Sequence, residues 1–244
     1  MADRIDPALI GAHAGELSAV LEGLSDPLSR QVFLDVIRMR LYGRPMRYPS
    51  GYHVYRHPLA RARKGDCIVD GGAAEGDTLQ SFLEDCQGDC AMHLFEPTPI
   101  SYKRLQNYIA THAVPGAQAV NKALWSSDTT LRFEENFGCT HSNHVSESGG
   151  CEVAATRLDS YVEETGLERV DLIKLDIEGA ELEALKGAEG VIRRHKPRLQ
   201  ICLYHKLEDL WEIPLYIKSI APEYRMYVGH HSCCTLDTVL YCVA

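Results

Sequence analysis

The stretch Ile68-Val69-Asp70-Gly71-Gly72-Ala73-Ala74-Glu75-Gly76-Asp77-Thr78 decides the fold that this sequence predicts. It reads as a buried strand, a glycine turn and the start of a helix. A second apolar run follows downstream and ends in Glu96. Glycines let the backbone approach a ligand closely, and a helix N-terminus presents free N–H groups to it. An acid at the tip of the second strand can bind ribose hydroxyls, so the pattern indicates a nucleotide site on a doubly wound sheet.

The spacing of the glycines helps to identify the nucleoside. A dinucleotide site usually carries Gly-x-Gly-x-x-Gly, whereas this chain has Asp70-x-Gly72-x-x-x-Gly76. The carboxylate of Asp70 would repel a pyrophosphate, but it would attract the ammonium and sulfonium groups of S-adenosylmethionine. The spacing therefore favours S-adenosylmethionine as the cofactor. An NAD-dependent oxidoreductase is the weaker enzymatic alternative, and a glycine turn without a ligand is the structural one.

Length and composition narrow the class of protein. The chain has 244 residues, of which 45% are hydrophobic, enough for one large α/β domain or two small ones. Its net charge of −9 argues against a broad nucleic-acid or anionic-membrane surface. No segment approaches the roughly 18 consecutive apolar residues of a membrane span, and the charged first residues show no secretory signal. Nine scattered cysteines fit reduced thiols in a core, so we expect a cytoplasmic protein.

The order of the predicted elements gives the fold class. Residues 6–42 look helical, in two pieces broken between Gly23 and Pro27, and residues 43–64 form a connector. Strands are expected at 67–71, 92–96, 117–121, 170–176 and 198–204, with helices at 76–86, 98–112, 179–195 and 208–220. This alternation predicts an α/β, doubly wound, mostly parallel sheet. Two closing strands, at 224–229 and 238–243, indicate a hairpin with one antiparallel strand. We therefore expect an N-terminal helical extension over residues 1–64 and a Rossmann-like domain over residues 65–244.

An insertion and the N-terminal helices complete this organisation. The insertion spans residues 131–158 and carries two short strands around the polar loop 136–150. That loop has little apolar surface to bury, so we expect it to be mobile and to lie on the acceptor side. A homo-oligomer could form through the N-terminal helices.

A third motif spans Val170 to Gly187 and reads as a buried strand, an acidic tip and an amphipathic helix. Lys174 interrupts the apolar strand, so we expect it to reach an edge or to pair with an acid. Asp176 follows at the carboxyl end of a central strand, where such sheets bind ligands. Glu178 and Glu181 have capping or functional roles that the sequence leaves open.

Taken in order, the motifs resemble the FkbM family of S-adenosylmethionine-dependent methyltransferases over about residues 65–243. The resemblance lies in Val69-Asp70-Gly71-Gly72-Ala73, Gly76-Asp77-Thr78, Leu94-Phe95-Glu96-Pro97-Thr98-Pro99, Asn121-Lys122-Ala123-Leu124, Thr156-Arg157-Leu158-Asp159-Ser160 and Ile173-Lys174-Leu175-Asp176-Ile177-Glu178-Gly179-Ala180-Glu181. It implies a seven-stranded sheet whose last strand is antiparallel, and O-methylation of a sugar or of a natural-product hydroxyl. The sequence departs at Ala74-Glu75, where many members carry Asn or Tyr before a hydrophobic or small residue.

The resemblance also implies roles for individual residues. Asp70, Gly72 and Gly76 would hold the methionyl part of the cofactor, with Thr78 and Glu75 in the same turn. Glu96 would bind the ribose. The remaining expected cofactor-binding positions are Pro97, Asn121, Ala123 and Asp176, of which Asn121 to Leu124 would flank the adenine and Asp176 would face the ammonium or the methyl-transfer site.

Methyl transfer to a hydroxyl needs an aligned acceptor and a base that removes its proton. We predict His205 as that base and Asp176 as its catalytic partner, since an imidazole titrates near working pH. Further candidates are His141, His144, His230 and His231. Asp176 and His205 could also supply two metal ligands, and Cys139-x-His141-x-x-His144 has ligand-type residues without a full tetrad. A divalent metal is therefore an open alternative that the sequence does not favour.

The sequence does not identify the acceptor. We expect a small-molecule or glycan acceptor, with specificity set by residues 1–60 and 136–150, and no nucleic acid. N-methylation and a non-catalytic nucleoside-binding protein remain alternatives.

Overall fold

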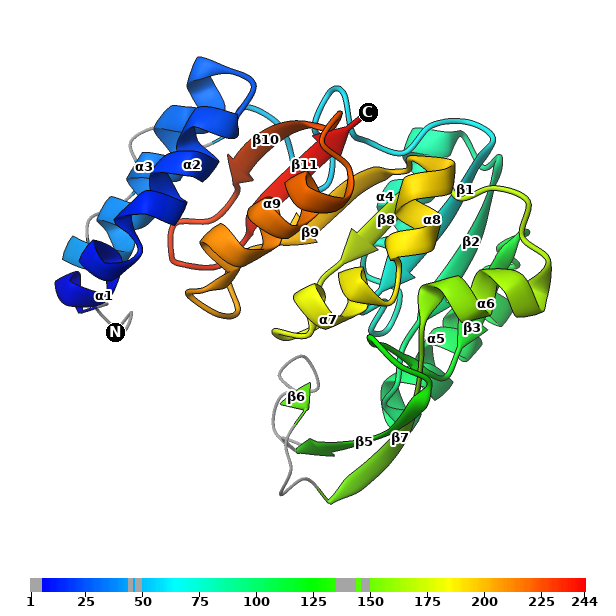
Figure 1. The fold of residues 1–244 in the computed structure, drawn as a ribbon. Helices are drawn as coiled ribbons and strands as arrows, with labels where there is room; N and C mark the ends of the chain where they lie inside the picture. The colour runs from blue at the N-terminus through cyan, green and yellow to red at the C-terminus, as the bar shows by residue number, and fades with distance from the viewer. Residues whose placement is uncertain (1–5, 44–45, 47–49, 135–143, 146–149) are drawn as a thin grey trace. The chain divides into compact units, whose positions relative to one another are not determined.

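The computed structural model describes residues 6–43, 46, 50–134, 144–145 and 150–244 (Figure 1). The chain divides into two compact units. The central unit is residues 62–197, and the terminal unit combines residues 1–61 with residues 198–244.

The central unit is built on parallel strands covered by helices on both faces. Strand β1 (Asp66–Gly71) pairs in parallel with β2 (Cys90–Phe95) and with β8 (Leu172–Leu175), and β3 (Ala117–Val120) pairs with β2. Helices α4 (Leu79–Cys86) and α5 (Pro99–Thr111) lie behind these strands in Figure 1, while α6 (Leu158–Thr165), α7 (Glu181–Lys186) and α8 (Glu189–His195) lie in front. Every residue of β1 and β8 is buried, which fits the apolar run Cys67-Ile68-Val69 in β1 and the residues Leu172, Ile173 and Leu175 in β8.

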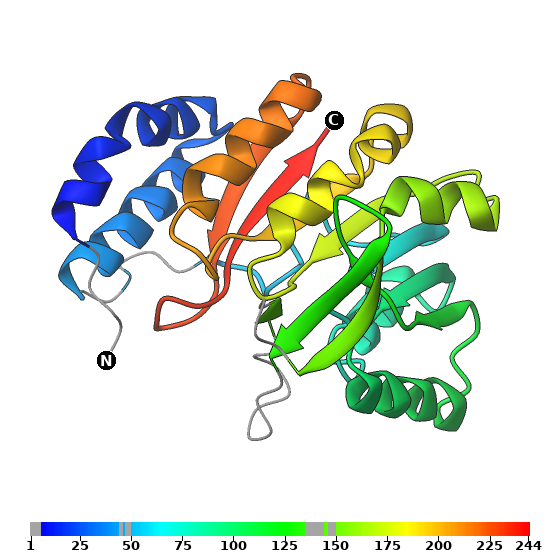
Figure 2. The same ribbon diagram turned by 60° about the horizontal axis from the view of Figure 1, so that its bottom comes forward.

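A small second sheet belongs to the same unit. Its strands are β4 (Ala123–Leu124), β5 (Thr129–Glu134), β6 (His144–Val145) and β7 (Cys151–Thr156). Figure 2 shows β5 and β7 side by side, and they pair antiparallel. A cluster of buried Ala123, Phe133, Val153 and Ala155 forms its core. The expected strands of the insertion are confirmed, while residues 136–143 and 146–149 of the predicted mobile loop lie outside the described residues.

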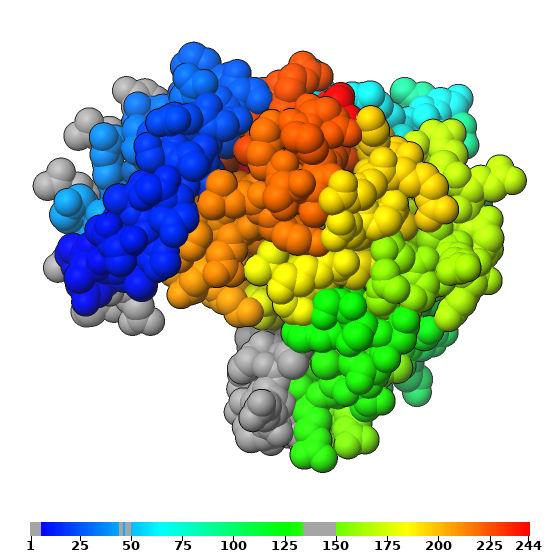
Figure 3. All heavy atoms as spheres, viewed as in Figure 1, coloured from blue at the N-terminus to red at the C-terminus, as the bar shows by residue number. Residues whose placement is uncertain are grey.

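The terminal unit joins segments from both parts of the sequence. Strand β11 (Thr238–Val243) is antiparallel to both β10 (Arg225–His230) and β9 (Arg198–Cys202). Helix α9 (Asp209–Ile220) and the helices α1 (Pro7–Ala12), α2 (Ala14–Gly23) and α3 (Pro27–Tyr42) complete it. Helix α3 contacts β10, and α2 lies beside α9, as Figure 3 shows. The rings of His13 and Trp211 stack with their centroids 4.4 Å apart.

Seven of the described strands form one sheet, in the order β10-β11-β9-β8-β1-β2-β3. This confirms the expected α/β fold, with a mainly parallel sheet whose last strand is antiparallel. No helix among the residues that the structure describes is long and apolar enough to cross a membrane. The domain boundary expected at residue 64 stays a prediction.

Several predicted element boundaries were wrong. The helical region 6–42 contains three helices, because α1 ends at Ala12 and His13 separates it from α2. The expected helix 179–195 is divided into α7 and α8 at Gly187, where the backbone passes so close to Trp125 that a Cβ would lie 1.9 Å from its carbonyl oxygen. Helix α4 begins at Leu79, not at residue 76, because a turn closed by a hydrogen bond from Gly76 N to Ala73 O precedes it. Helix α6 was not anticipated.

Candidate functional site

A buried ion pair lies beneath the glycine turn that follows β1. Asp70 and Lys174 are neighbours in the β1–β8 register, and Lys174 Nζ lies 2.8 Å from Asp70 Oδ1. Both side chains are at most 1% exposed. The Thr78 hydroxyl donates to the other carboxylate oxygen, although Thr78 makes no side-chain cap to α4. The prediction that Lys174 pairs with an acid is confirmed. Asp70 faces these two partners, so its immediate role is to hold the turn.

Lys174 also binds the turn directly. Its ammonium donates to Gly71 O at 3.2 Å and to Gly72 O at 2.9 Å. Gly72 has a φ of +76°, and a Cβ there would lie 1.8 Å from Asp176 O. Asp176 N in turn donates to Gly71 O. The ends of β1 and β8 are therefore tied together, which places the first and third sequence motifs side by side.

Glu96 lies just after β2 and closes the other side of the turn. Its Oε2 accepts a hydrogen bond from Ala74 N at 3.1 Å, and its Oε1 accepts from Thr98 N at 2.9 Å and from the Thr98 hydroxyl. Burial raises the pKa of Glu96, an effect that these hydrogen bonds and the charge of Lys174 oppose. A carboxylate has about four acceptor positions. The three hydrogen bonds found among the described residues leave one for a ligand hydroxyl.

The other expected cofactor residues frame the same region. Asn121 Nδ2 donates to Glu96 O and to Pro97 O, each at 2.9 Å. These two bonds hold the backbone of Glu96 and Pro97 in place. The side chain of Ala123 is buried in the core of the small sheet, which leaves its backbone as the part that could contact a cofactor. Glu75 pairs with Arg104 of α5.

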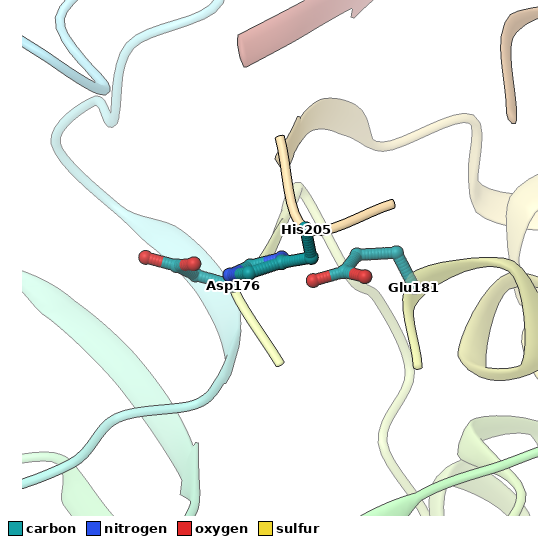
Figure 4. A group of neighbouring side chains, drawn as sticks. All are labelled: Asp176, Glu181 and His205. Atoms are coloured by element: carbon teal, nitrogen blue, oxygen red, sulfur yellow. The ribbon is translucent and has the colours of Figure 1, made fainter. Parts of the chain in front are cut away.

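The acidic tip after β8 is a closed loop. Glu181 is fully buried at the start of α7 and accepts a hydrogen bond from Ile177 N at 2.8 Å. Between them, Glu178 and Gly179 have φ values of 55° and 90°. This arrangement gives Glu181 a structural role that the sequence had left open, and its bond to Ile177 fixes the backbone next to Asp176. Figure 4 shows the side chains of Asp176 and Glu181.

His205 belongs to the terminal unit, three residues after β9 rather than at the end of the strand as predicted. Hydrogen bonds hold its neighbours: Leu203 N donates to Thr238 O, and Arg40 Nη2 donates to Tyr204 O. On the other side, Lys206 N donates to the buried Asp209 carboxylate. The half-buried imidazole lies against the Tyr204 ring, with the centroids 4.1 Å apart. His205 therefore has a well-fixed backbone.

The alternative histidines differ in what they can do. The carbonyl of Tyr52 can only accept, so the contact to His231 Nδ1 at 3.1 Å places the proton on that nitrogen. Burial lowers the pKa of His231 to about 4, and in the neutral ring Nε2 accepts from the Tyr241 hydroxyl at 2.9 Å. Both ring nitrogens are thus engaged. His230 is fully buried, and its Nδ1 forms a hydrogen bond of 2.8 Å with the Thr238 hydroxyl. His141 and the side chain of His144 lie outside what the structure describes.

Sequence reasoning missed two contributors to the site. Thr98 supplies two of the three hydrogen bonds to Glu96, and only its position two residues after that acid could have indicated this. The bonds from Lys174 to the glycine carbonyls were also not foreseen. The signal was the presence of one lysine in an otherwise apolar strand.

Comparison with known proteins identifies the family. The family model described as the methyltransferase FkbM domain matches residues 70–230, from the ion-paired Asp70 to the end of β10. The chain belongs to this family. The resemblance found in the sequence is thereby confirmed.

Individual relatives in this FkbM family are distant in sequence. The chain is 25% identical over 204 residues to the 2-O-methyltransferase NoeI of Sinorhizobium fredii, covering 75% of this chain and 82% of NoeI. It is 28% identical over 142 residues to the hexuronic acid methyltransferase AglP of Haloferax volcanii, covering 57% of each.

A solved structure of an FkbM methyltransferase shares the fold of this chain. The crystal structure of a methyltransferase FkbM from Methylobacillus flagellatus KT superposes with a TM-score of 0.81 and 26% identity. The match covers 96% of this chain but 60% of the other. The similarity thus extends over both units, while the longer relative has additional parts.

Proposed function

We propose that this protein is an S-adenosylmethionine-dependent methyltransferase that methylates a hydroxyl of a sugar or small-molecule natural product. Membership of the FkbM family supports methyl transfer. The name of NoeI, a 2-O-methyltransferase, supports transfer to oxygen, and that of AglP, a hexuronic acid methyltransferase, supports a sugar acceptor. The observation that carries the cofactor assignment is the turn closed by Glu96: a backbone N–H and a carboxylate meet at the end of β1 and β2.

The residues of the turn fit the parts of the cofactor. The buried Asp70–Lys174 pair holds the Gly71–Gly72 backbone, so that backbone groups can approach the methionyl part closely. The remaining acceptor position of Glu96 suits a ribose hydroxyl. Asp176 offers a carboxylate beside the turn for the cofactor ammonium. S-adenosylmethionine, when bound, supplies an electrophilic methyl group on its sulfonium.

The proposed base is His205. Removal of the hydroxyl proton requires a group that titrates near neutral pH, as an imidazole does. His205 lies on a backbone fixed by three hydrogen bonds, while His231 has both ring nitrogens engaged. A supporting role of Asp176, the absence of a metal requirement and the cytoplasmic location stay predictions.

Calorimetric titration with S-adenosylhomocysteine tests the cofactor assignment. Glu96→Ala should weaken binding by about 1.5–3 kcal/mol, the range for hydrogen bonds to a charged group. Glu168→Ala is the matched control, because Glu168 is an exposed acid of the same unit outside the turn. Equal affinities of the two variants would remove Glu96 from the site.

A second assay separates an enzyme from a binding protein. The radioactive methyl group of S-adenosylmethionine is offered to a panel of glycosides, natural-product alcohols and matching amines, and transfer to a hydroxyl should give a methyl ether. Tight binding of S-adenosylhomocysteine without transfer to any acceptor would favour the non-catalytic alternative. Transfer to amines alone would establish N-methylation instead.

A further inference from the structure

Helix α5 is joined to the proposed cofactor site at two places in the central unit. Thr98, the residue directly before the helix, donates to Glu96 Oε1 from its backbone N–H and from its hydroxyl. Further along the helix, the guanidinium of Arg104 forms an ion pair with the Glu75 carboxylate in the glycine turn. The structure describes every residue from 70 to 111, so both contacts lie in a fully described part of the chain. The helix therefore connects Glu96 with the turn that Glu96 closes.

The turn also packs against α5 beside this ion pair. A Cβ placed on Gly76 would lie 3.4 Å from Tyr108 Cδ1 and 3.5 Å from Leu105 Cδ1, which are ordinary van der Waals distances. Arg104 and Tyr108 are four positions apart on the helix, so they share one face. The same face of α5 thus supports Gly76 by packing and Glu75 by charge.

The turn holds Ala74 in a conformation that is unfavourable for alanine. Its φ is +46°, in the left-handed region, where a Cβ lies too close to the following carbonyl oxygen. In this conformation Ala74 N donates to Glu96 Oε2 at 3.1 Å. Strained backbone persists only where its surroundings hold it. The bond to Glu96 and the ion pair of the next residue, Glu75, with Arg104 are two such restraints.

We propose that Glu75 is a positioning residue of the cofactor site. It acts through Arg104 to hold the Ala74 N–H on Glu96, and it does not bind the cofactor itself. Without the ion pair the turn can leave the left-handed conformation, and Glu96 then loses the donor that orients its Oε2. The inference rests on the proposed function, in which Glu96 binds the ribose. It gives Glu75 a different role from the cofactor contact expected from the sequence.

Calorimetric titration with S-adenosylhomocysteine at low salt tests this role in the full chain. The side chains of Glu75 and Arg104 are 35% and 55% exposed, and an exposed ion pair contributes little. Glu75→Gln and Arg104→Met should therefore each weaken binding by about two- to fivefold. The double variant should bind no more weakly than the single ones, because both changes remove the same interaction. Exchanging the charges, with Glu75→Arg and Arg104→Glu, should recover most of the affinity.

Salt provides a second readout of the same ion pair. At about 1 M salt the Debye length falls to roughly 3 Å, so exposed charges are strongly screened. The ratio of the affinities of the wild type and Glu75→Gln should then approach one.

Arg193→Met is the matched control. Its ion pair with Glu189 on α8 is similarly exposed, at 53% and 41%, but lies outside the turn, so cofactor affinity should not change. A loss of affinity in only one of Glu75→Gln and Arg104→Met would overturn the inference, because a direct cofactor contact acts without its partner. So would a charge-exchanged variant that binds as weakly as the single ones, or an equal loss in Arg193→Met. Unchanged affinity in both single variants refutes the positioning role alone, whereas a wild type that does not bind S-adenosylhomocysteine refutes the proposed function.

Discussion

Replacement of Lys174 by Met should expose how much the glycine turn depends on its buried charge. The substitution leaves the Asp70 carboxylate fully buried, with the Thr78 hydroxyl as its remaining partner among the described residues, and it removes the donor to Gly72 O. Removing one partner of a buried pair typically costs about 3–5 kcal/mol. At roughly 2–4 °C per kcal/mol for a chain of this size, the melting temperature should fall by about 6–20 °C.

Differential scanning calorimetry and urea unfolding at pH 7 measure this loss. The double variant Asp70→Asn with Lys174→Met should recover part of it, because no charge is then left buried. Arg193→Met is the control: it breaks an exposed pair with Glu189 on α8 and should cost at most about 1 kcal/mol. The reasoning is refuted if Lys174→Met costs no more than this control, or if the double variant is no more stable than Lys174→Met.

Three further predictions concern the same elements. Burial raises the pKa of Glu96. The affinity for S-adenosylhomocysteine should therefore be full above that pKa and be lost as the pH falls through it, at a higher pH than for an ordinary glutamate. Glu96→Gln should flatten this pH profile in calorimetric titrations. Gly72→Ala should abolish cofactor binding and destabilise the fold by more than about 1–3 kcal/mol, because the new Cβ would clash with Asp176 O. Gly88→Ala is the control: Gly88 has the same φ of +76° but lies in open space, so this variant measures the backbone cost alone. Similar melting curves for the two variants would contradict the steric argument. His205→Ala should lower methyl transfer about 100- to 10,000-fold at unchanged cofactor affinity, while His112→Ala retains activity; near-normal turnover of His205→Ala would exclude it as the base.

The sequence predicted the strands of the main sheet and their mostly parallel arrangement, because strand periodicity, glycine spacing and strand–helix alternation can be seen in the sequence. Apart from the ion-paired Asp70 and Lys174, the residues 67–69 and 172–175 are apolar because both strands are buried. The family motifs then indicated which strand ends carry Glu96 and Asp176. The division of the helix at Gly187 was not predictable, because it depends on contact with Trp125 from a distant segment.

The orientation of the site residues could not be predicted from the sequence. Asp70 was expected to meet the cofactor, yet the structure points its two oxygens at Lys174 and Thr78. A residue type shows that a charge is present, whereas its partner depends on the strand register. The engagement of both His231 nitrogens likewise required the positions of Tyr52 and Tyr241.

The make-up of the terminal unit has a consequence for the order of folding. Ser25 and Met226 are joined by two hydrogen bonds, Ser25 N to Met226 O and Met226 N to Ser25 Oγ, across 201 positions of sequence. Helices α2 and α3 must therefore wait on the ribosome until β10 has been synthesised, whereas the central unit is one continuous stretch that can fold as it emerges. A slow final docking phase of these helices should therefore follow the synthesis of β10.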